Sequence, residues 1–242
     1  NLVAEGFRRS IPRFVGIFPP DVDYYRATVS AATRTYYAYY IGELNEELAA
    51  WSPSVPEVSG TGRRPLNILV GHRGAPSLRH LEVLGRLEAY KAEDILVRIP
   101  LTYGDPGYRE RVRRFAAERF GDKAAPIMEH MAQAAYHEVL AGIDVAVFDT
   151  DRQIGLGNLM PLFHLGKKVM MPKGSPMYEY FTSEGINIAD SSTIGTEPFR
   201  EFASTVDMSG GARFVRENDT ARQERMWTEL FDDIDGARTD PA

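Results

Sequence analysis

The fold of this chain is decided by residues 66–77, which read LNILVGHRGAPS. The short apolar run 66–71 is typical of a strand buried on both faces of a sheet. A glycine-containing turn follows it, and Ser77 then has the position of a helix N-cap. The next leucines recur at helical spacing: Leu78, Leu81, Leu84 and Leu87. A strand, a turn and a helix in this succession predict the first unit of an α/β sheet.

The same alternation continues toward the C-terminus. Further buried strands are expected at 95–99, 125–128, 145–148 and 168–171. The helices between and after them are expected at 106–120, 132–141, 157–165 and 177–184. Strands that alternate with helices of this length favour a parallel, doubly wound sheet with right-handed crossovers.

The flanking segments have a different character. Residues 52–65 carry three prolines, two glycines and three serines and form the clearest linker. Before it, residues 21–51 are expected to be mainly helical with Asp21 as N-cap, and a last amphipathic helix is expected at 218–234. We therefore divide the chain into a mainly helical N-terminal segment with its linker (1–60), a Rossmann-like domain (61–205) and a C-terminal helix (206–242).

A basic and aromatic cluster lies near the start of the chain and consists of Phe7, Arg8, Arg9, Arg13, Phe14 and Phe18. One interpretation is contact with an anionic membrane surface, which takes apolar burial together with several basic residues. We prefer the alternative, in which the aromatic side chains pack on the helix that follows Asp21.

Composition excludes several classes of protein. The chain has 242 residues and a net charge of −6, which argues against general nucleic-acid binding because phosphates attract a concentrated positive surface. Without cysteine it has no disulfide, thiolate metal site, iron–sulfur cluster or cysteine nucleophile. Its five histidines show no zinc-ligand spacing, so we expect no metal site. The first residue, Asn1, leads us to expect a piece of a longer protein.

Two loops carry the chemistry that the sequence predicts. In an open parallel sheet, ligands bind beyond the carboxyl ends of the strands, and glycines beside a helix start and a guanidinium form an anion site there. The loop after the first strand supplies Gly71, His72, Arg73, Gly74 and Ser77. The loop after strand 145–148 supplies Arg152, Gln153, Gly157 and Asn158. Together they indicate a diphosphate, although an ordinary glycine-rich turn is the alternative for each loop alone.

Other residues at strand ends carry weaker signals. Tyr103 stands beside a glycine, where it either stacks on a base or sugar or forms part of a plain turn. Glu129 ends the third strand, where dinucleotide folds bind a ribose hydroxyl, although exposed glutamates are mostly solvated. Asp149 and Asp151 are more simply interpreted as helix caps than as an acid–base pair, and an N-cap is also the alternative for Asn158.

The order of these motifs resembles that of a known family, the 4-acetamido-4,6-dideoxygalactose (Fuc4NAc) transferases of enterobacterial common antigen assembly. The matching stretches are 67-NILVGHRGAPS-77 with 80-HLEVL-84, 100-PLTYGD-105 with Tyr108, 120-FGDK-123, 128-MEHM-131 with Tyr136, 144-DVAVF-148, the motif of Arg152, Gln153, Gly157 and Asn158, and 165-LGKKV-169. The resemblance covers about residues 66–190. It implies the C-terminal, donor-binding half of a GT-B glycosyltransferase, that is, a GT-B-like Rossmann domain with a parallel sheet.

The resemblance also implies a function. Members of that family transfer a TDP-linked amino sugar to an undecaprenyl-diphosphate-linked saccharide, which makes the implied protein a cytoplasmic hexosyltransferase at the inner face of the cytoplasmic membrane. We expect no metal or other cofactor, because helix N-termini and arginines can hold the diphosphate. The resemblance implies that Gly71, Arg73, Ser77, Gln153, Gly157 and Asn158 hold the diphosphate, with Glu129 near the nucleoside. The candidate donor-binding residues also include His72, Gly74, Tyr103 and Arg152. The sequence assigns no catalytic residue.

Two features separate this chain from the family pattern. Leu78 and Arg79 stand where the family usually has Asn after the Pro-Ser pair, so the sugar or nucleotide preference is expected to differ. Residues 1–60 are too few for the acceptor-binding domain of a whole GT-B enzyme, so we expect a missing N-terminal domain or a partner subunit. Two other functions stay open. A non-catalytic sugar-nucleotide-binding module has the anion loops without a base, and a sugar-nucleotide epimerase has a free carboxylate pair facing the sugar.

Overall fold

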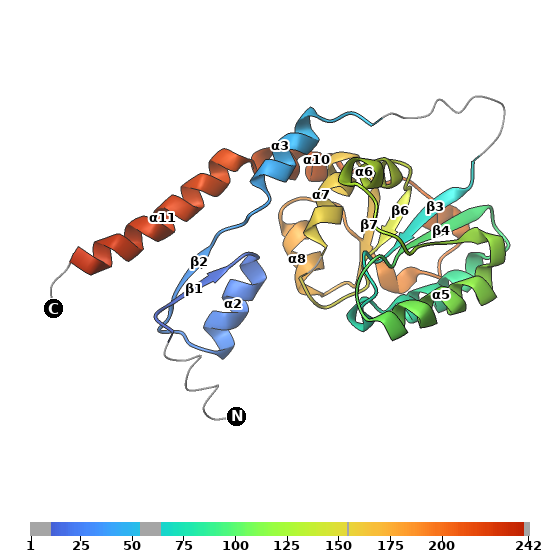
Figure 1. Cartoon of the computed structure of the whole chain (residues 1–242), viewed down its shortest axis with the longest axis horizontal. Coiled ribbons are helices and arrows are strands. Elements are labelled where there is room, and N and C mark those ends of the chain that lie inside the picture. The colour runs from blue at the N-terminus through green and yellow to red at the C-terminus, as the bar shows by residue number, and fades with distance from the viewer. Residues whose placement is uncertain (1–10, 54–63, 154, 240–242) are drawn as a thin grey trace. The chain divides into compact units, whose positions relative to one another are not determined.

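The computed structural model describes residues 11–53, 64–153 and 155–239 of the chain (Figure 1). The chain forms two compact units, one of Asn1–Ala50 with Val215–Ala242 and one of Trp51–Phe214. This grouping differs from the division at 1–60, 61–205 and 206–242, in which the two ends of the chain are separate.

The larger unit contains a six-stranded sheet in the order β5-β4-β3-β6-β7-β8, and every neighbouring pair of strands is parallel. The strands are β3 Leu66–Val70, β4 Ile95–Pro100, β5 Ala124–Ile127, β6 Val145–Val147, β7 Lys168–Met171 and β8 Ala189–Asp190. The first strand of this unit, β3, lies in the middle of the sheet. The next two, β4 and β5, extend it on one side, and β6, β7 and β8 extend it on the other. This is the doubly wound order, and the predicted α/β fold is confirmed.

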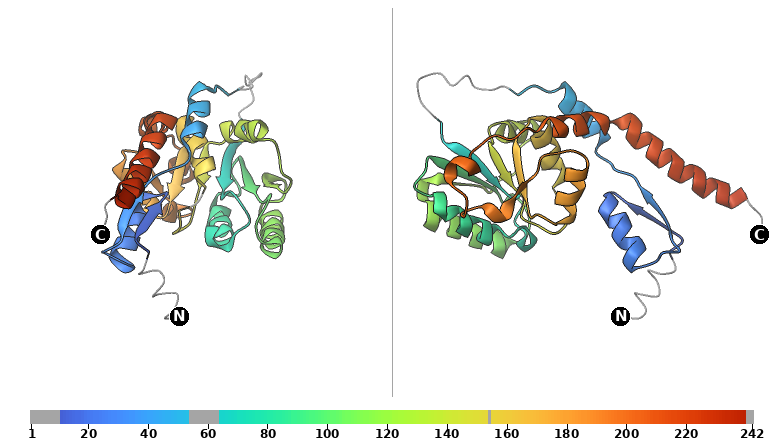
Figure 2. Two further views of the ribbon diagram at one scale, coloured as in Figure 1. Left: turned by 60° about the vertical axis from the view of Figure 1, so that its left-hand side comes forward. Right: turned by 180° about the vertical axis from the view of Figure 1, so that it is seen from behind.

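Helices surround this sheet, as Figure 2 shows from two further sides. The α-helices are α4 His80–Leu87, α5 Pro106–Phe120, α6 Gln133–Ala141, α7 Leu156–His164, α8 Pro176–Ser183, α9 Phe199–Phe202 and α10 Ser209–Glu217. The short 3-10 turns are η1 Pro76–Leu78, η2 Glu88–Tyr90, η3 Gly121–Lys123 and η4 Ser191–Thr193.

The core lies on the two faces of the central strand β3. Ile68, Leu69 and Val70 are all fully buried, and because successive side chains of a strand alternate between faces, both faces of β3 are covered. Ile68 and Val70 belong to one apolar cluster with residues of α4 and α5, among them Val83 and Val112. The apolar run that opened the sequence analysis therefore forms the doubly buried strand that it predicted.

The smaller unit is only partly as predicted. Its elements are β1 Arg13–Gly16, α2 Pro19–Thr28, β2 Arg34–Tyr37, α3 Gly42–Ala50 and α11 Thr220–Thr239. The expected helical stretch 21–51 is wrong in its middle, where β2 pairs in parallel with β1. Thr35, Tyr36 and Tyr37 are residue types that favour a strand, which explains the interruption. The N-cap of α2 is Phe18, so Asp21 lies in its first turn.

The described members of the basic and aromatic cluster, Arg13, Phe14 and Phe18, pack within this unit, as we preferred. The rings of Phe14 and Tyr25 are stacked with centroids 4.0 Å apart, and Phe18 is only 2% exposed. Arg13 donates from Nε to Asp233 of α11 over 3.1 Å. The other members, Phe7, Arg8 and Arg9, lie outside the described residues. Over the described ranges, no helix has both the length and the apolar character needed to cross a membrane.

The loops after β3 and β4 are joined at two glycines. Gly74 N–H donates to the Tyr103 carbonyl over 2.8 Å, and Asp105 N–H donates to the Gly74 carbonyl over 2.9 Å. Gly104 has φ +118°, and a Cβ atom there overlaps the Gly74 carbonyl. Glycine is required at this position because any side chain separates the two loops.

Replacing Gly104 by alanine is expected to lower the free energy of unfolding by about 1–3 kcal/mol, because it adds a strained φ and a backbone clash. Gly85→Ala is the matched control: its Cβ meets nothing within 4 Å inside α4, so it is expected to be neutral or to stabilise by about 0.5–1 kcal/mol. Urea denaturation followed by circular dichroism measures both. Equal effects of the two substitutions contradict the glycine junction.

Candidate functional site

A cavity lies where the loops after β3, β4, β5 and β6 meet at the carboxyl edge of the sheet. Its volume is about 380 Å³, and it is lined by His72, Pro100, Thr102, Tyr103, His130, Met131, Gln133, Tyr136 and Asn158. The strands β3 and β6 are neighbours although two strands separate them in sequence, so this edge holds the topological switch point of the sheet. Three of the predicted donor-binding residues, His72, Tyr103 and Asn158, therefore share one cavity.

The loop after β3 is shaped by its glycines. Gly71 has φ +67°, and a Cβ there lies 2.5 Å from Nε2 of the buried His80. His72 is 7% exposed, and its Nδ1 atom has no hydrogen-bond partner among the described residues. Arg73 is half-buried with its Nε also unpartnered within that set. The loop thus presents polar atoms that a ligand can satisfy.

The start of the following helix differs from the prediction. Ser77 lies in the 3-10 turn η1, and α4 begins only at His80 with Arg79 as its N-cap. Arg79 has φ +47°, the only non-glycine residue of the described chain with a positive φ. Ser77 is therefore not the helix cap, and the structure does not place it among the residues that line the cavity.

The loop after β6 ends in a glycine as well. Gly155 has φ +79° and is the N-cap of α7, so the alternative that Asn158 caps this helix is wrong. Gly157 and Asn158 lie in the first turn, where the Asn158 N–H donates to the Gly155 carbonyl over 2.8 Å. The oxygen Oδ1 of Asn158 accepts a 2.6 Å hydrogen bond from the Tyr136 hydroxyl. Before the glycine, Arg152 is exposed and Gln153 is half-buried.

Asp149 and Asp151 do not cap α7. Asp149 accepts from Nη1 of Arg79 over 3.0 Å and from the Ser191 hydroxyl over 3.1 Å, and it also pairs with Arg86. Asp151 pairs with Arg79. The Asp149 side chain is only 5% exposed, so the carboxylate needs opposite charges rather than backbone N–H groups alone. The two carboxylates hold arginines and are not free for acid–base chemistry.

Tyr103 and Glu129 differ in their position relative to the cavity. Tyr103 is 52% exposed at the rim of the cavity, where a base or sugar can stack on it. Glu129 is exposed and does not line the cavity, although its neighbours His130 and Met131 do. The role predicted for Glu129 at the ribose stays a prediction.

Sequence reasoning missed the part of the cavity that α6 and its preceding loop provide. Gln133 and Tyr136 of α6 line it, and so does Thr102 after β4. The rule that ligands bind beyond strand ends applies to β5 as much as to β3 and β6. Tyr136 also stands in one of the motifs of the family resemblance, which was the available signal.

Burial sets the charge of the histidines at this edge. Burial, and to a smaller extent the charge of Arg73, lowers the pKa of His72 to about 4. Burial, and then the neighbouring His72, lowers the pKa of His80 to about 4 as well. Both imidazoles are therefore neutral at pH 7, and His72 offers a ligand a hydrogen bond rather than a charge. Within the described ranges, no group of three His, Cys, Asp or Glu side chains is placed to hold a metal ion.

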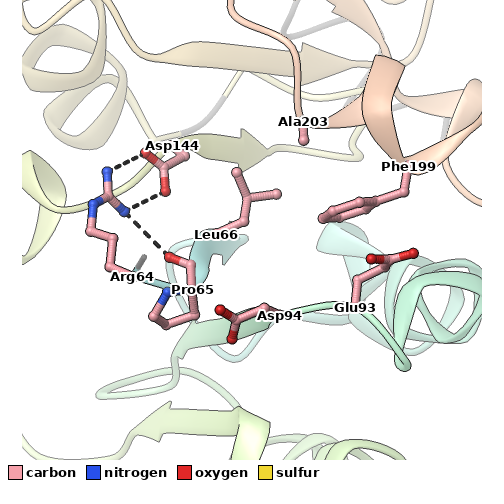
Figure 3. Close-up of a pocket in the computed structure, with 8 residues that line it drawn as sticks. All are labelled: Arg64, Pro65, Leu66, Glu93, Asp94, Asp144, Phe199 and Ala203. Atoms are coloured by element: carbon pink, nitrogen blue, oxygen red, sulfur yellow. Dashed lines mark hydrogen bonds and ion pairs between the residues drawn. The ribbon is translucent and has the colours of Figure 1, made fainter. Parts of the chain in front are cut away.

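A second cavity of about 400 Å³ lies at the opposite, amino edge of the sheet (Figure 3). It is lined by Arg64, Pro65, Leu66, Glu93, Asp94, Asp144, Phe199 and Ala203. Arg64 and Asp144 face each other there and form two hydrogen bonds of 2.6 Å. Arg64 and Asp144 already neutralise each other, and this edge holds the amino ends of the strands rather than their carboxyl ends. This cavity is therefore the weaker candidate for a phosphate ligand.

Comparison with known proteins agrees with this geometry. A family model described as 4-alpha-L-fucosyltransferase glycosyl transferase group 56 matches residues 10–200. The chain belongs to this family. The match extends beyond the stretch 66–190 on which the resemblance was based, and it includes β1, β2 and every residue of the candidate site.

Several solved structures share the fold. Sucrose-phosphate synthase from Thermosynechococcus elongatus has a TM-score of 0.72 at 14% identity, over 98% of this chain and 61% of that one. A glycosyltransferase from Rickettsia africae ESF-5 has a TM-score of 0.72 at 12% identity, over 97% of this chain and 67% of that one. Anabaena HepE, solved with UDP and glucose, has a TM-score of 0.68 at 11% identity, over 96% and 66%. These are GT-B glycosyltransferases, so the predicted fold type is confirmed, and the chain spans less than two thirds of the first of them.

The two buried histidines make stability depend on pH. They stay neutral in the folded protein down to about pH 4, whereas the unfolded chain takes up their protons near pH 6.5. The unfolded state then binds more protons, so the free energy of unfolding falls as the pH drops from about 6.5 to 4, by about 1.4 kcal/mol per pH unit for each histidine. His80→Gln is expected to remove half of this slope in urea titrations. The exposed His130→Gln is the control, and an equal change there contradicts the assignment.

The Asp149 ion pairs also predict a stability difference. Asp149→Ala leaves two arginines without their buried partner and is expected to cost about 3–5 kcal/mol of unfolding free energy. Asp151, whose side chain is 63% exposed, pairs with Arg79 in solvent, so Asp151→Ala is expected to cost about 0–1 kcal/mol. Denaturant titration compares the two variants. A loss for Asp149→Ala as small as that for Asp151→Ala shows that the pairs do not hold the loop.

Proposed function

We propose that this chain is the donor-binding part of a hexosyltransferase that uses a nucleoside-diphosphate sugar. The supporting observation is the convergence of two glycine-containing loops, after β3 and β6, on one cavity at the switch point of the sheet. Membership of a family described as fucosyltransferases supports a deoxyhexose as the transferred group. We propose TDP as the nucleotide, on the family resemblance of the loop motifs.

The proposed task of the site is to stabilise the leaving diphosphate. Negative charge grows on its oxygens as the glycosidic bond breaks, and fixed donors that meet this charge lower the barrier. The proposed donors are the Asn158 amide, which lines the cavity, the first N–H groups of α7, and the guanidinium groups of Arg73 and Arg152 on the two adjoining loops. The neutral His72 adds a hydrogen bond from the other loop. In this proposal these groups replace a divalent metal.

The acceptor and the catalytic base are proposed to lie on a further domain or partner subunit. Among the described residues, those that line the cavity include no carboxylate, and the candidate pair Asp149 and Asp151 is engaged with arginines. That engagement also argues against an epimerase, which needs free carboxylates. We propose an undecaprenyl-diphosphate-linked saccharide as acceptor, in cell-surface polysaccharide assembly such as that of enterobacterial common antigen. This places the protein in the cytoplasm, at the membrane face.

The second candidate function is a sugar-nucleotide-binding module without transferase activity. It is favoured by the same observation, a cavity without a carboxylate that can act as base. Because the proposed base lies on a further domain or partner subunit, the two are separated by incubating the chain together with that domain or subunit, the radiolabelled sugar nucleotide and a lipid-linked saccharide. Transfer to the saccharide supports the enzyme, whereas tight binding without transfer or hydrolysis supports the module.

Calorimetry with TDP and UDP in the presence of a chelator tests the proposed ligand. Arg73→Ala is expected to weaken TDP by roughly tenfold to a hundredfold, because a hydrogen bond to a charged group contributes about 1.5–3 kcal/mol. Binding of thymidine, which has no phosphate, is expected to stay unchanged. Arg114→Ala on the exposed face of α5 is the matched control. Lack of binding to either nucleotide contradicts the proposal, and strict dependence on magnesium contradicts its metal-free part.

A further inference from the structure

The hydroxyl of Tyr136 forms a hydrogen bond with Asn158, the residue of α7 that lines the cavity. Tyr136 lies on α6, twenty-two residues before Asn158, and donates to its Oδ1 atom over 2.6 Å. Both residues line the cavity at the carboxyl edge. Helices α6 and α7 pack on each other, so the bond joins two neighbouring elements.

This bond fixes the direction of the Asn158 amide. A side-chain amide has an acceptor at one end and two N–H donors at the other, and a free amide can exchange the two by rotating. With Oδ1 bound to Tyr136, the Nδ2 donors are turned away from α6. Asn158 lies in the first turn of α7 and its own backbone N–H donates to the Gly155 carbonyl, so the Nδ2 group is the donor that this residue offers a ligand.

Tyrosine at position 136 fixes which side chain donates this hydrogen bond. Burial, and then the neighbouring Tyr103, raises the pKa of Tyr136 well above its usual range. The hydroxyl therefore keeps its proton at all ordinary pH values and donates it. A serine on α6 is too short to reach Asn158, and an ionised carboxylate has no proton to donate.

We propose that Tyr136 is a positioning residue that directs the Nδ2 donors of Asn158 at the diphosphate of the bound nucleotide. The inference rests on the proposed function and goes beyond it, because it assigns to Tyr136 a role that acts on the diphosphate through the side chain of Asn158. It makes the Tyr136 and Asn158 pair a determinant of diphosphate over nucleoside binding.

The first test is a double-mutant cycle with TDP, inorganic diphosphate and thymidine as calorimetric probes. Asn158→Ala is expected to weaken TDP by roughly tenfold to a hundredfold. Tyr136→Phe is expected to weaken TDP and diphosphate by at least about threefold and thymidine not at all. Because Tyr136 acts only through Asn158, the double variant is expected to bind no more weakly than Asn158→Ala alone. Tyr178→Phe on α8, whose side chain does not line the cavity, is the matched control and is expected to bind as the wild type does.

The outcomes are distinct. Unchanged TDP binding by Tyr136→Phe, an equal loss of thymidine, or additive losses in the double variant each overturn the inference while the proposed function stands. If the wild-type chain binds none of TDP, inorganic diphosphate and thymidine, both the inference and the proposed function are wrong. Asn158→Asp covers the case in which Tyr136→Phe does not fold, because it keeps the acceptor for Tyr136 and removes the donors. Its melting temperature is expected near the wild-type value with TDP binding lost, and wild-type affinity for TDP overturns the inference.

Discussion

Asp149 lies almost fully buried at the end of β6, between the guanidinium groups of Arg79 and Arg86 and the hydroxyl of Ser191. One carboxylate thereby joins the segment after β3, the helix α4, the loop after β6 and the turn after β8. A buried charge of this kind persists only when it is paired and hydrogen-bonded, and removal of one partner leaves the others costly. The position of the loops after β3 and β6, two of the four that form the cavity, depends on this arrangement.

The same arrangement decides which charges remain for a ligand. Arg79 is engaged by Asp149 and Asp151, so the departure from the family pattern at this position serves the scaffold. In the proposed function, Arg73 and the start of α7 meet the diphosphate. The glycine junction of Gly74 and Gly104 sets the third side of the cavity, because it holds the loop after β4 against the loop after β3. The donors of the proposed diphosphate site therefore come from several rigid strand ends rather than from one flexible loop.

The sequence alone predicted the sheet because its signal is local. Short apolar runs such as 66–71 and helical leucine spacing are properties of adjacent residues, and each strand end then follows from its position. The tyrosine-rich segment 21–51 misled the prediction because its apolar residues fit a helix and a strand equally well. The roles of Asp149 and Tyr136 were out of reach for another reason. Their partners lie 70 and 22 residues away, and no spacing rule connects residues that meet only in the folded chain.

The central claim is that a nucleoside diphosphate binds at the carboxyl edge, between the loops after β3 and β6. Amide chemical-shift mapping of the full chain, labelled with nitrogen-15 and titrated with TDP, tests it most directly. The account predicts the largest shifts in residues 71–78, 130–136 and 155–158, with little change elsewhere in the sheet. Shifts centred on Arg64, Asp144 and Phe199 at the amino edge, or no saturable shifts at all, contradict it.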